Sequence, residues 1–145
     1  MIQHIDVHAV LQESVPGGGV YGDLVTRPTG RVVREQIERA IATAAVARVD
    51  FTGVGCIDYS CADEIVAKLL RERPAVLVLS GISDAHREAI EPVLAGHGLA
   101  ALIEGPGGAL ETLGAPEAAA VLLEELVARR LAARTPGGTF APTLA

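Results

Sequence analysis

The most informative stretch of the chain is Val49-Asp50-Phe51-Thr52-Gly53-Val54-Gly55-Cys56-Ile57-Asp58-Tyr59-Ser60-Cys61-Ala62-Asp63-Glu64. Its first residues belong to a short run from which we predict a strand over Ala47–Thr52. A helix from Ser60 to about Arg73 is predicted next, because Ser60 suits an N-cap and Asp63 has the spacing of a capping box. Apolar residues then recur at helical spacing: Ile65, Val66, Leu69 and Leu70.

The residues that follow repeat this alternation of strand and helix. Ala75–Ser80 is continuously apolar, which is typical of a strand covered on both faces. Ser83 is the expected N-cap of a helix that continues to about Gly96, and Leu99–Ile103 is the next predicted strand. Alternating strands and helices imply right-handed crossovers and a largely parallel sheet. We therefore expect an α/β fold in which Ala47–Thr52 and Ala75–Ser80 are parallel neighbours.

The N-terminal part contains two further predicted strands and one helix. The strands are His4–Leu11 and Tyr21–Thr26, and Pro16–Gly19 has the composition of a turn or mobile loop between them. A helix is expected to begin near Thr29 as its N-cap. Its apolar side chains follow helical spacing: Val33, Ile37, Ile41 and Ala44.

The C-terminal part differs in composition from the rest. Pro116–Ala132 is rich in Ala, Leu and Glu, and this predicts a long helix. Leu131–Arg134 and Thr139–Thr143 flank a Pro-Gly-Gly segment, which favours a hairpin. We expect a boundary near residues 113 and 114, giving a domain over 1–113 and a helix-and-hairpin extension over 114–145.

Composition excludes several classes of function. The chain has 145 residues, a formal charge of −6 at pH 7 and four aromatic residues, so nucleic acid is not an expected partner. Its single lysine, Lys68, lies in Val-Ala-Lys-Leu and not in a P-loop. Apolar runs are too short for a membrane span, and the N-terminus lacks the basic segment of a secretory signal. We therefore expect a cytoplasmic protein that does not bind membranes.

The stretch from Asp50 to Glu64 resembles the STAS family, which is named for sulphate transporters and anti-sigma-factor antagonists. Members have an apolar-Asp-apolar strand, a spacer, and an Asp followed by Ser or Thr where a helix opens. The order of elements over residues 21–103 also agrees, and the closer likeness is to a bacterial STAS-like branch that favours Phe or Cys followed by Ala-Asp-Glu at the helix start. The resemblance implies a SpoIIAA-like mixed, mostly parallel sheet with helices, here followed by the C-terminal helix and hairpin.

In these antagonists a partner kinase phosphorylates the serine that opens the helix, and the unmodified protein captures an anti-sigma factor. By position this serine is Ser60. The resemblance thus implies a non-enzymatic regulatory module that binds an anti-sigma factor or a kinase-like regulator, with a possible homodimer as its assembly. The candidate contacts are all at the helix start: Asp58, Tyr59, Ser60, Cys61, Asp63 and Glu64.

Three other interpretations stay open. Ser60 as a helix cap, which is worth ~1 kcal/mol, is the simpler interpretation of this residue and is favoured over the switch. Asp58, Asp63 and Glu64 could supply the acid and base of a small hydrolase or transferase. Some STAS domains bind nucleotides, so a module that senses a small ligand is the third interpretation.

No metal or cofactor is expected from the histidines and cysteines. His4 and His8 would share a face of a strand, but two histidines without a third ligand make a poor metal site. Cys56 and Cys61 match neither the redox spacing nor a zinc pair. We expect both to be reduced, buried, small apolar side chains.

Overall fold

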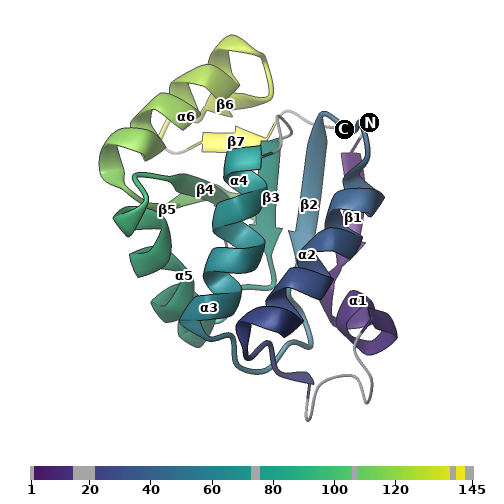
Figure 1. Cartoon of the computed structure of the whole chain (residues 1–145). Helices are drawn as coiled ribbons and strands as arrows, with labels where there is room; N and C mark the ends of the chain where they lie inside the picture. Colours follow the sequence, from purple (N-terminus) through teal and green to yellow (C-terminus); the bar gives the residue numbers. More distant parts are fainter. Residues whose placement is uncertain (1, 15–21, 73–75, 106–107, 138–139, 143–145) are drawn as a thin grey trace.

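A seven-stranded sheet runs through the part of the chain that the computed structural model describes, namely residues 2–14, 22–72, 76–105, 108–137 and 140–142 (Figure 1). The strand order is β1-β2-β3-β4-β5-β7-β6; β1 to β4 are parallel, and the remaining neighbours are antiparallel. The strands are β1 Ile2–Asp6, β2 Val46–Asp50, β3 Val76–Ser80, β4 Ala100–Glu104, β5 Leu110–Gly114, β6 Ala132–Arg134 and β7 Phe140–Pro142. The expected α/β class with a mixed, mostly parallel sheet is confirmed.

Helices cover one face of the parallel strands (Figure 1). The helical segments are α1 Val7–Ser14, α2 Arg27–Ile41, α3 Tyr59–Cys61, η3 Ala62–Ala67, α4 Lys68–Glu72, α5 Asp84–Gly96 and α6 Pro116–Ala128. The segments α3, η3 and α4 follow one another directly, with a π-helical turn in η3. Since β1 to β4 lie in chain order, right-handed crossovers bring α1 to α5 to the same face.

The central prediction is confirmed. Strands β2 and β3 pair in parallel from Val46 opposite Val76 to Asp50 opposite Ser80, and the helix that contains Ser60 connects them. Helix α5 begins after Ser83, whose Oγ accepts the His86 N–H at 3.1 Å. These elements were predictable because each combines a clear period with a local start signal.

The N-terminal predictions are partly wrong. β1 ends at Asp6 and α1 begins at once, because the Asp6 carboxylate accepts the Ala9 N–H and so favours a helix where we predict strand His4–Leu11 to continue. The predicted strand Tyr21–Thr26 is also wrong, since Leu24 forms only an isolated bridge with Ile57. Tyr21 and the predicted turn Pro16–Gly19 lie outside the described residues.

Two helix boundaries also differ from the prediction. Helix α2 starts after Thr26, three residues before the N-cap expected at Thr29. Helix α6 ends at Ala128 and not at Ala132, because Arg130 adopts φ 61° and turns the chain toward β6. The end expected at Arg73 for the helix containing Ser60 lies outside the described residues.

The C-terminal hairpin belongs to the same sheet as the rest. β6 pairs antiparallel with β7, and β7 joins the sheet through β5, an element that the sequence did not predict. The expected boundary near residue 113 therefore falls within β5. The predicted division into 1–113 and 114–145 describes two stretches that share one sheet.

Alternate strand residues divide between two apolar clusters. Those that face the helices belong to a large core with α1 to α5: Ala47, Val49, Leu77, Leu79, Ala101 and Ile103. Those on the opposite face form a smaller cluster that includes Leu126 of α6 and Ala132 of β6: Val46, Val76, Val78, Leu102 and Leu110. The sheet thus has a helix-covered face and a second face that α6 and the hairpin cover in part.

Candidate protein-binding surface

Asp58, and not Ser60, is the N-cap of the helix that was expected to carry the site. Asp58 Oδ1 accepts the Cys61 N–H at 2.8 Å and the Ser60 hydroxyl at 2.7 Å. Asp58 Oδ2 accepts the Thr26 N–H at 2.9 Å, which ties the start of α2 to the start of α3. Burial acts to raise the pKa of Asp58, but the hydrogen bonds from Cys61 and Thr26 outweigh it and hold this pKa below its ordinary value. The N-cap prediction for Ser60 is wrong by two positions.

The three residues that follow Asp58 have different surroundings. The Tyr59 side chain is 63% exposed, and Ser60 is half-buried. Cys61 faces the large core, and its Sγ donates to the Thr26 carbonyl at 3.1 Å. Burial, together with the nearby Asp58 charge, raises the pKa of the Cys61 thiol to about 12. Tyr59 is therefore exposed and Ser60 partly so, whereas Cys61 is a core residue.

Asp63 joins three helices at the surface. Arg27 of α2 donates from Nη1 to Oδ2 at 2.7 Å, and His97, just after α5, lies with Nε2 at 2.9 Å from Oδ1. Burial acts to raise the pKa of Asp63, but the hydrogen bonds from Arg27 and His97 lower it below its ordinary value. The Asp63 carboxylate is consequently charged and held in place.

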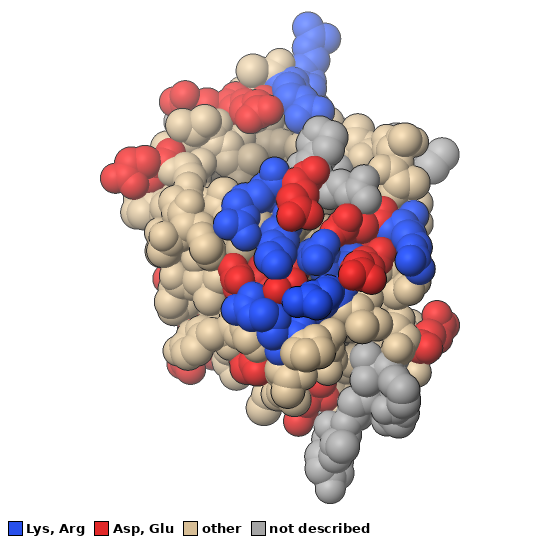
Figure 2. All heavy atoms as spheres, in the orientation of Figure 1, with Lys and Arg blue, Asp and Glu red and all other residues tan. Residues whose placement is uncertain are grey.

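Glu64 is a buried carboxylate, 1% exposed, at the crossing of α2 and η3. Among the described residues it receives Arg27 Nη1 at 2.9 Å and Lys68 Nζ at 2.8 Å, with Arg34 Nε at 3.7 Å. Burial acts to raise its pKa, but the hydrogen bonds from Lys68 and Arg27 keep the pKa below its ordinary value. Arg34 also pairs with Glu38 and Glu72, and Figure 2 shows a mixed patch of acidic and basic side chains over α2 and α4.

Gly30 permits the close crossing on which this network depends. A Cβ at position 30 would lie 3.0 Å from Glu64 Cβ and 3.2 Å from Cys61 Cα. Any larger residue would push α2 away from η3. The fold thus explains why Glu64, predicted as a partner contact, is an internal charge of the helix layer.

An open hollow of about 450 Å³ adjoins the exposed helix start. Its lining combines the helix start with α2 and the end of α5: Arg27, Tyr59, Ser60, Asp63, Pro92, Val93, Gly96 and His97. Tyr59, Ser60 and Asp63 were predicted from the motif, whereas Arg27 and His97 were not. Neither has a motif signal, since each lies more than 30 residues from Asp63 and reaches it only through helix packing.

Of the carboxylates considered for acid–base chemistry, Asp63 and Glu64 both accept from Arg27 Nη1, at 2.7 and 2.9 Å, whereas Asp58 has other partners. Asp58 caps a helix, Asp63 bridges Arg27 and His97, and Glu64 is internal. All three pKa values lie below their ordinary values, so none is suited to donate a proton near pH 7.

The remaining candidate side chains are dispersed. His4 lies in β1 and His8 in α1, so the argument from a shared strand face does not apply to them. Cys56 is exposed, which corrects the expectation of two buried thiols, and both cysteines are free. Among the residues that the structure describes, no three His, Cys, Asp or Glu side chains are grouped to hold a metal ion.

Comparison with known proteins leaves the STAS resemblance as a prediction. No family model matches the chain, and no curated protein or solved structure matches it significantly. Of the described helices, none is long and apolar enough to cross a membrane. The case for a function therefore rests on the motif over Asp50–Glu64 and on the geometry of this surface.

Proposed function

We propose that the chain is a non-enzymatic regulatory module that binds a protein partner through Tyr59 and Ser60, as anti-sigma-factor antagonists do. The exposure of Tyr59 carries this proposal: a large aromatic side chain is 63% exposed at the rim of the hollow beside Ser60. Aromatic residues are enriched at protein interfaces and often supply much of the binding free energy. Ser60 matches the regulated serine of STAS antagonists by position, whereas Tyr59 stands where that family has a small residue.

The charges around Tyr59 indicate the chemistry of the partner. The side chains of Arg27 and His97 are 45% and 38% exposed, whereas Asp63 between them is 19% exposed. The rim of the hollow therefore presents donors more than acceptors. A fitting partner has an apolar recess for Tyr59 with acidic side chains beside it, and the resemblance suggests an anti-sigma factor or a kinase-like regulator in the cytoplasm.

Ser60 is the proposed regulatory position. Its hydroxyl lies 2.7 Å from Asp58 Oδ1, so a phosphoryl group there would bring about two negative charges against an existing carboxylate. Binding would then require those charges to lose water at the interface. Phosphorylation is thus expected to release the partner while the fold persists.

The direct test is photocrosslinking from this surface in an extract of the native host. A photoreactive phenylalanine analogue at Tyr59 should give a specific crosslinked protein, whereas the same analogue at Val121, 64% exposed on α6, serves as the control. Crosslinking of the same proteins from both positions, or from neither, would contradict the proposal.

The identified partner then allows the switch to be measured. Tyr59→Ala and Ser60→Asp should each weaken binding by at least tenfold, with Tm close to that of the wild type. Ser60→Ala should bind normally, because it removes one hydroxyl and leaves the Asp58 cap to Cys61. Equal affinity of Ser60→Asp and wild type would refute the phosphoserine switch, and normal binding by Tyr59→Ala would refute the surface itself.

A further inference from the structure

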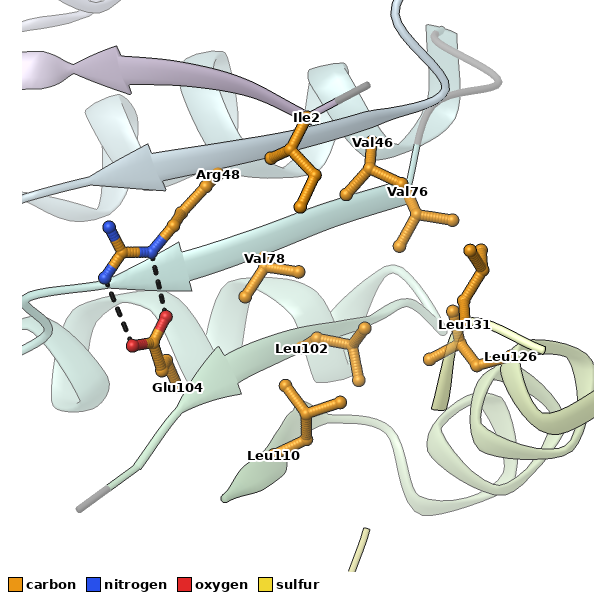
Figure 3. A pocket seen from close by; sticks show the side chains of 10 residues that line it. All are labelled: Ile2, Val46, Arg48, Val76, Val78, Leu102, Glu104, Leu110, Leu126 and Leu131. Atoms are coloured by element: carbon orange, nitrogen blue, oxygen red, sulfur yellow. Dashed lines mark hydrogen bonds and ion pairs between the residues drawn. The ribbon is translucent and has the colours of Figure 1, made fainter. Parts of the chain in front are cut away.

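A second cavity lies on the other face of the sheet, remote from Tyr59. It measures about 140 Å³ and lies between the strands and the end of α6 (Figure 3). Eight aliphatic side chains form most of its wall: Ile2, Val46, Val76, Val78, Leu102, Leu110, Leu126 and Leu131. Arg48 and Glu104 lie at the end farther from α6 (Figure 3).

Most of the aliphatic wall is buried, whereas Ile2, Leu131 and the Arg48–Glu104 pair are partly exposed. Val46, Leu102 and Leu126 are each at most 4% exposed. Protein interiors rarely retain voids much larger than one water molecule, and an apolar cavity of similar size is known to stay dry and to admit benzene. The cavity therefore has the size and lining of a site for a compact apolar molecule.

The polar end restricts the ligand further. Arg48 Nε and Nη2 donate to the two Glu104 oxygens at 2.8 and 3.1 Å, so each charge is already paired. Asp6 and Asp50 line an adjacent hollow with Arg48, which makes an additional anion unfavourable. A cation would have to displace Arg48 from Glu104. A hydroxyl group, by contrast, can donate to the carboxylate and accept from the guanidinium while the pair persists.

We propose that this cavity binds a small neutral molecule with a compact apolar body and one hydroxyl group, of the class of simple phenols. The apolar body lies among Val78, Leu102 and Leu126, and the hydroxyl group lies at the Arg48–Glu104 pair. The site is independent of the surface proposed for the protein partner. The chain would thus combine a binding surface on its helix side with a small-molecule site on its second face.

Methyl-labelled full-length protein titrated with p-cresol, toluene and p-toluate tests the proposal. p-Cresol should cause saturable shifts of the Val78, Leu102 and Leu126 methyl signals, with those of Val49 and Leu79 on the helix-covered face unchanged. It should bind at least fivefold more tightly than toluene, and p-toluate should not bind. Absence of saturation with p-cresol, or equal shifts on both faces, would overturn the proposal.

Variants identify the cavity and its polar end. Val78→Phe should abolish p-cresol binding by filling the space, whereas Val121→Phe on the exposed side of α6 should not. If Val78→Phe does not fold, Leu110→Phe takes its place. The paired change Arg48→Met with Glu104→Met should abolish the preference for p-cresol over toluene and retain toluene binding. Continued p-cresol binding by variants that fold with the cavity filled would overturn the proposal. So would a dimer, detected by light scattering, whose formation shifts the same methyl signals.

Discussion

The two faces of the sheet are built from the same strands but completed differently. On the helix-covered face, Val49 and Leu79 belong to one continuous core with α1 to α5. On the second face, Val78 and Leu102 line a cavity of about 140 Å³ beneath the end of α6. Consecutive residues of a strand point to opposite faces, so neighbours in sequence lie either in a filled core or beside a cavity.

The charged groups differ between the faces in the same way. Glu64, on the helix side, is 1% exposed and contacts Arg27 and Lys68. The Arg48–Glu104 pair on the second face has side chains 37% and 33% exposed. The helix side thus contains a buried charged group, whereas the charged pair of the second face is partly exposed at one end of the cavity. Stability is expected to depend on the first face and ligand binding on the second.

The largest expected difference comes from matched leucine deletions. Leu79→Ala should lower the free energy of unfolding by about 3–5 kcal/mol, because it opens a new cavity in a filled core. Leu102→Ala should cost about 2 kcal/mol, because it only enlarges a space that already exists. Urea unfolding of both variants measures the difference. Equal losses would show that the two faces are packed alike.

The acidic residues of the two faces give the next comparison. Glu64→Gln should destabilise the protein by about 2–4 kcal/mol, since it leaves Arg27 and Lys68 beside a neutral buried group. Glu104→Gln should cost less than about 1 kcal/mol, because that pair is partly solvated. Chemical denaturation at pH 7 measures both losses of stability. If Glu104→Gln lowered the free energy of unfolding as much as Glu64→Gln, the buried charges of the helix side would not be the more important ones.

Acid should weaken the helix side through its carboxylates. Asp58, Asp63 and Glu64 have pKa values below the ordinary 3.8 for Asp and 4.5 for Glu, so the unfolded chain binds more protons in acid. Their contribution to stability is full above about pH 4.5 and is lost as the pH falls through their folded-state pKa values. Denaturant midpoints between pH 6 and 3 should fall less steeply for Glu64→Gln than for wild type. Glu104→Gln is the control, and an unaltered slope for Glu64→Gln would refute this origin of acid sensitivity.

The smallest expected effects come from adding one methylene group to each face. Val78→Ile should stabilise the protein by about 0.5–1 kcal/mol, because the new atoms enter the cavity. Val49→Ile should destabilise it by about 1 kcal/mol, because no free space receives them. Thermal melting of the two variants compares the signs. Destabilisation by Val78→Ile would indicate that the cavity cannot accept even one more carbon.

The elements predicted well from sequence were those with local signals at both ends. β3 has a continuous apolar run, and α5 has the Ser83 cap. β5 was missed because a five-residue segment with little pattern becomes a strand only by pairing with β4. The start of α1 was missed because a short apolar run fits a strand or a helix, and the Asp6 cap decides between them.

The site was predictable only where its residues are adjacent in sequence. Tyr59, Ser60 and Asp63 were found from the motif, whereas Arg27 and His97 join them only through the folded helices. The burial of Cys61 did have a signal, because Cys61 and Ile65 are four residues apart on one helical stripe. The cavity on the second face had none, since alternate apolar residues predict a covered face but not how completely it is filled.

The order of the strands has a consequence for how the chain assembles as it is synthesised. From β1 to β5 neighbours in the sheet follow chain order, so each new unit can dock beside the previous one while later residues are still being added. The final hairpin departs from this order, because β7 pairs with β5 and leaves β6 outermost. Leu126 and Leu131, which close the cavity, therefore take their places only after β1 to β5 have been synthesised. A nascent chain that stops before α6 can bury its helix side and still expose the apolar second face, which makes that face the one for chaperones to recognise.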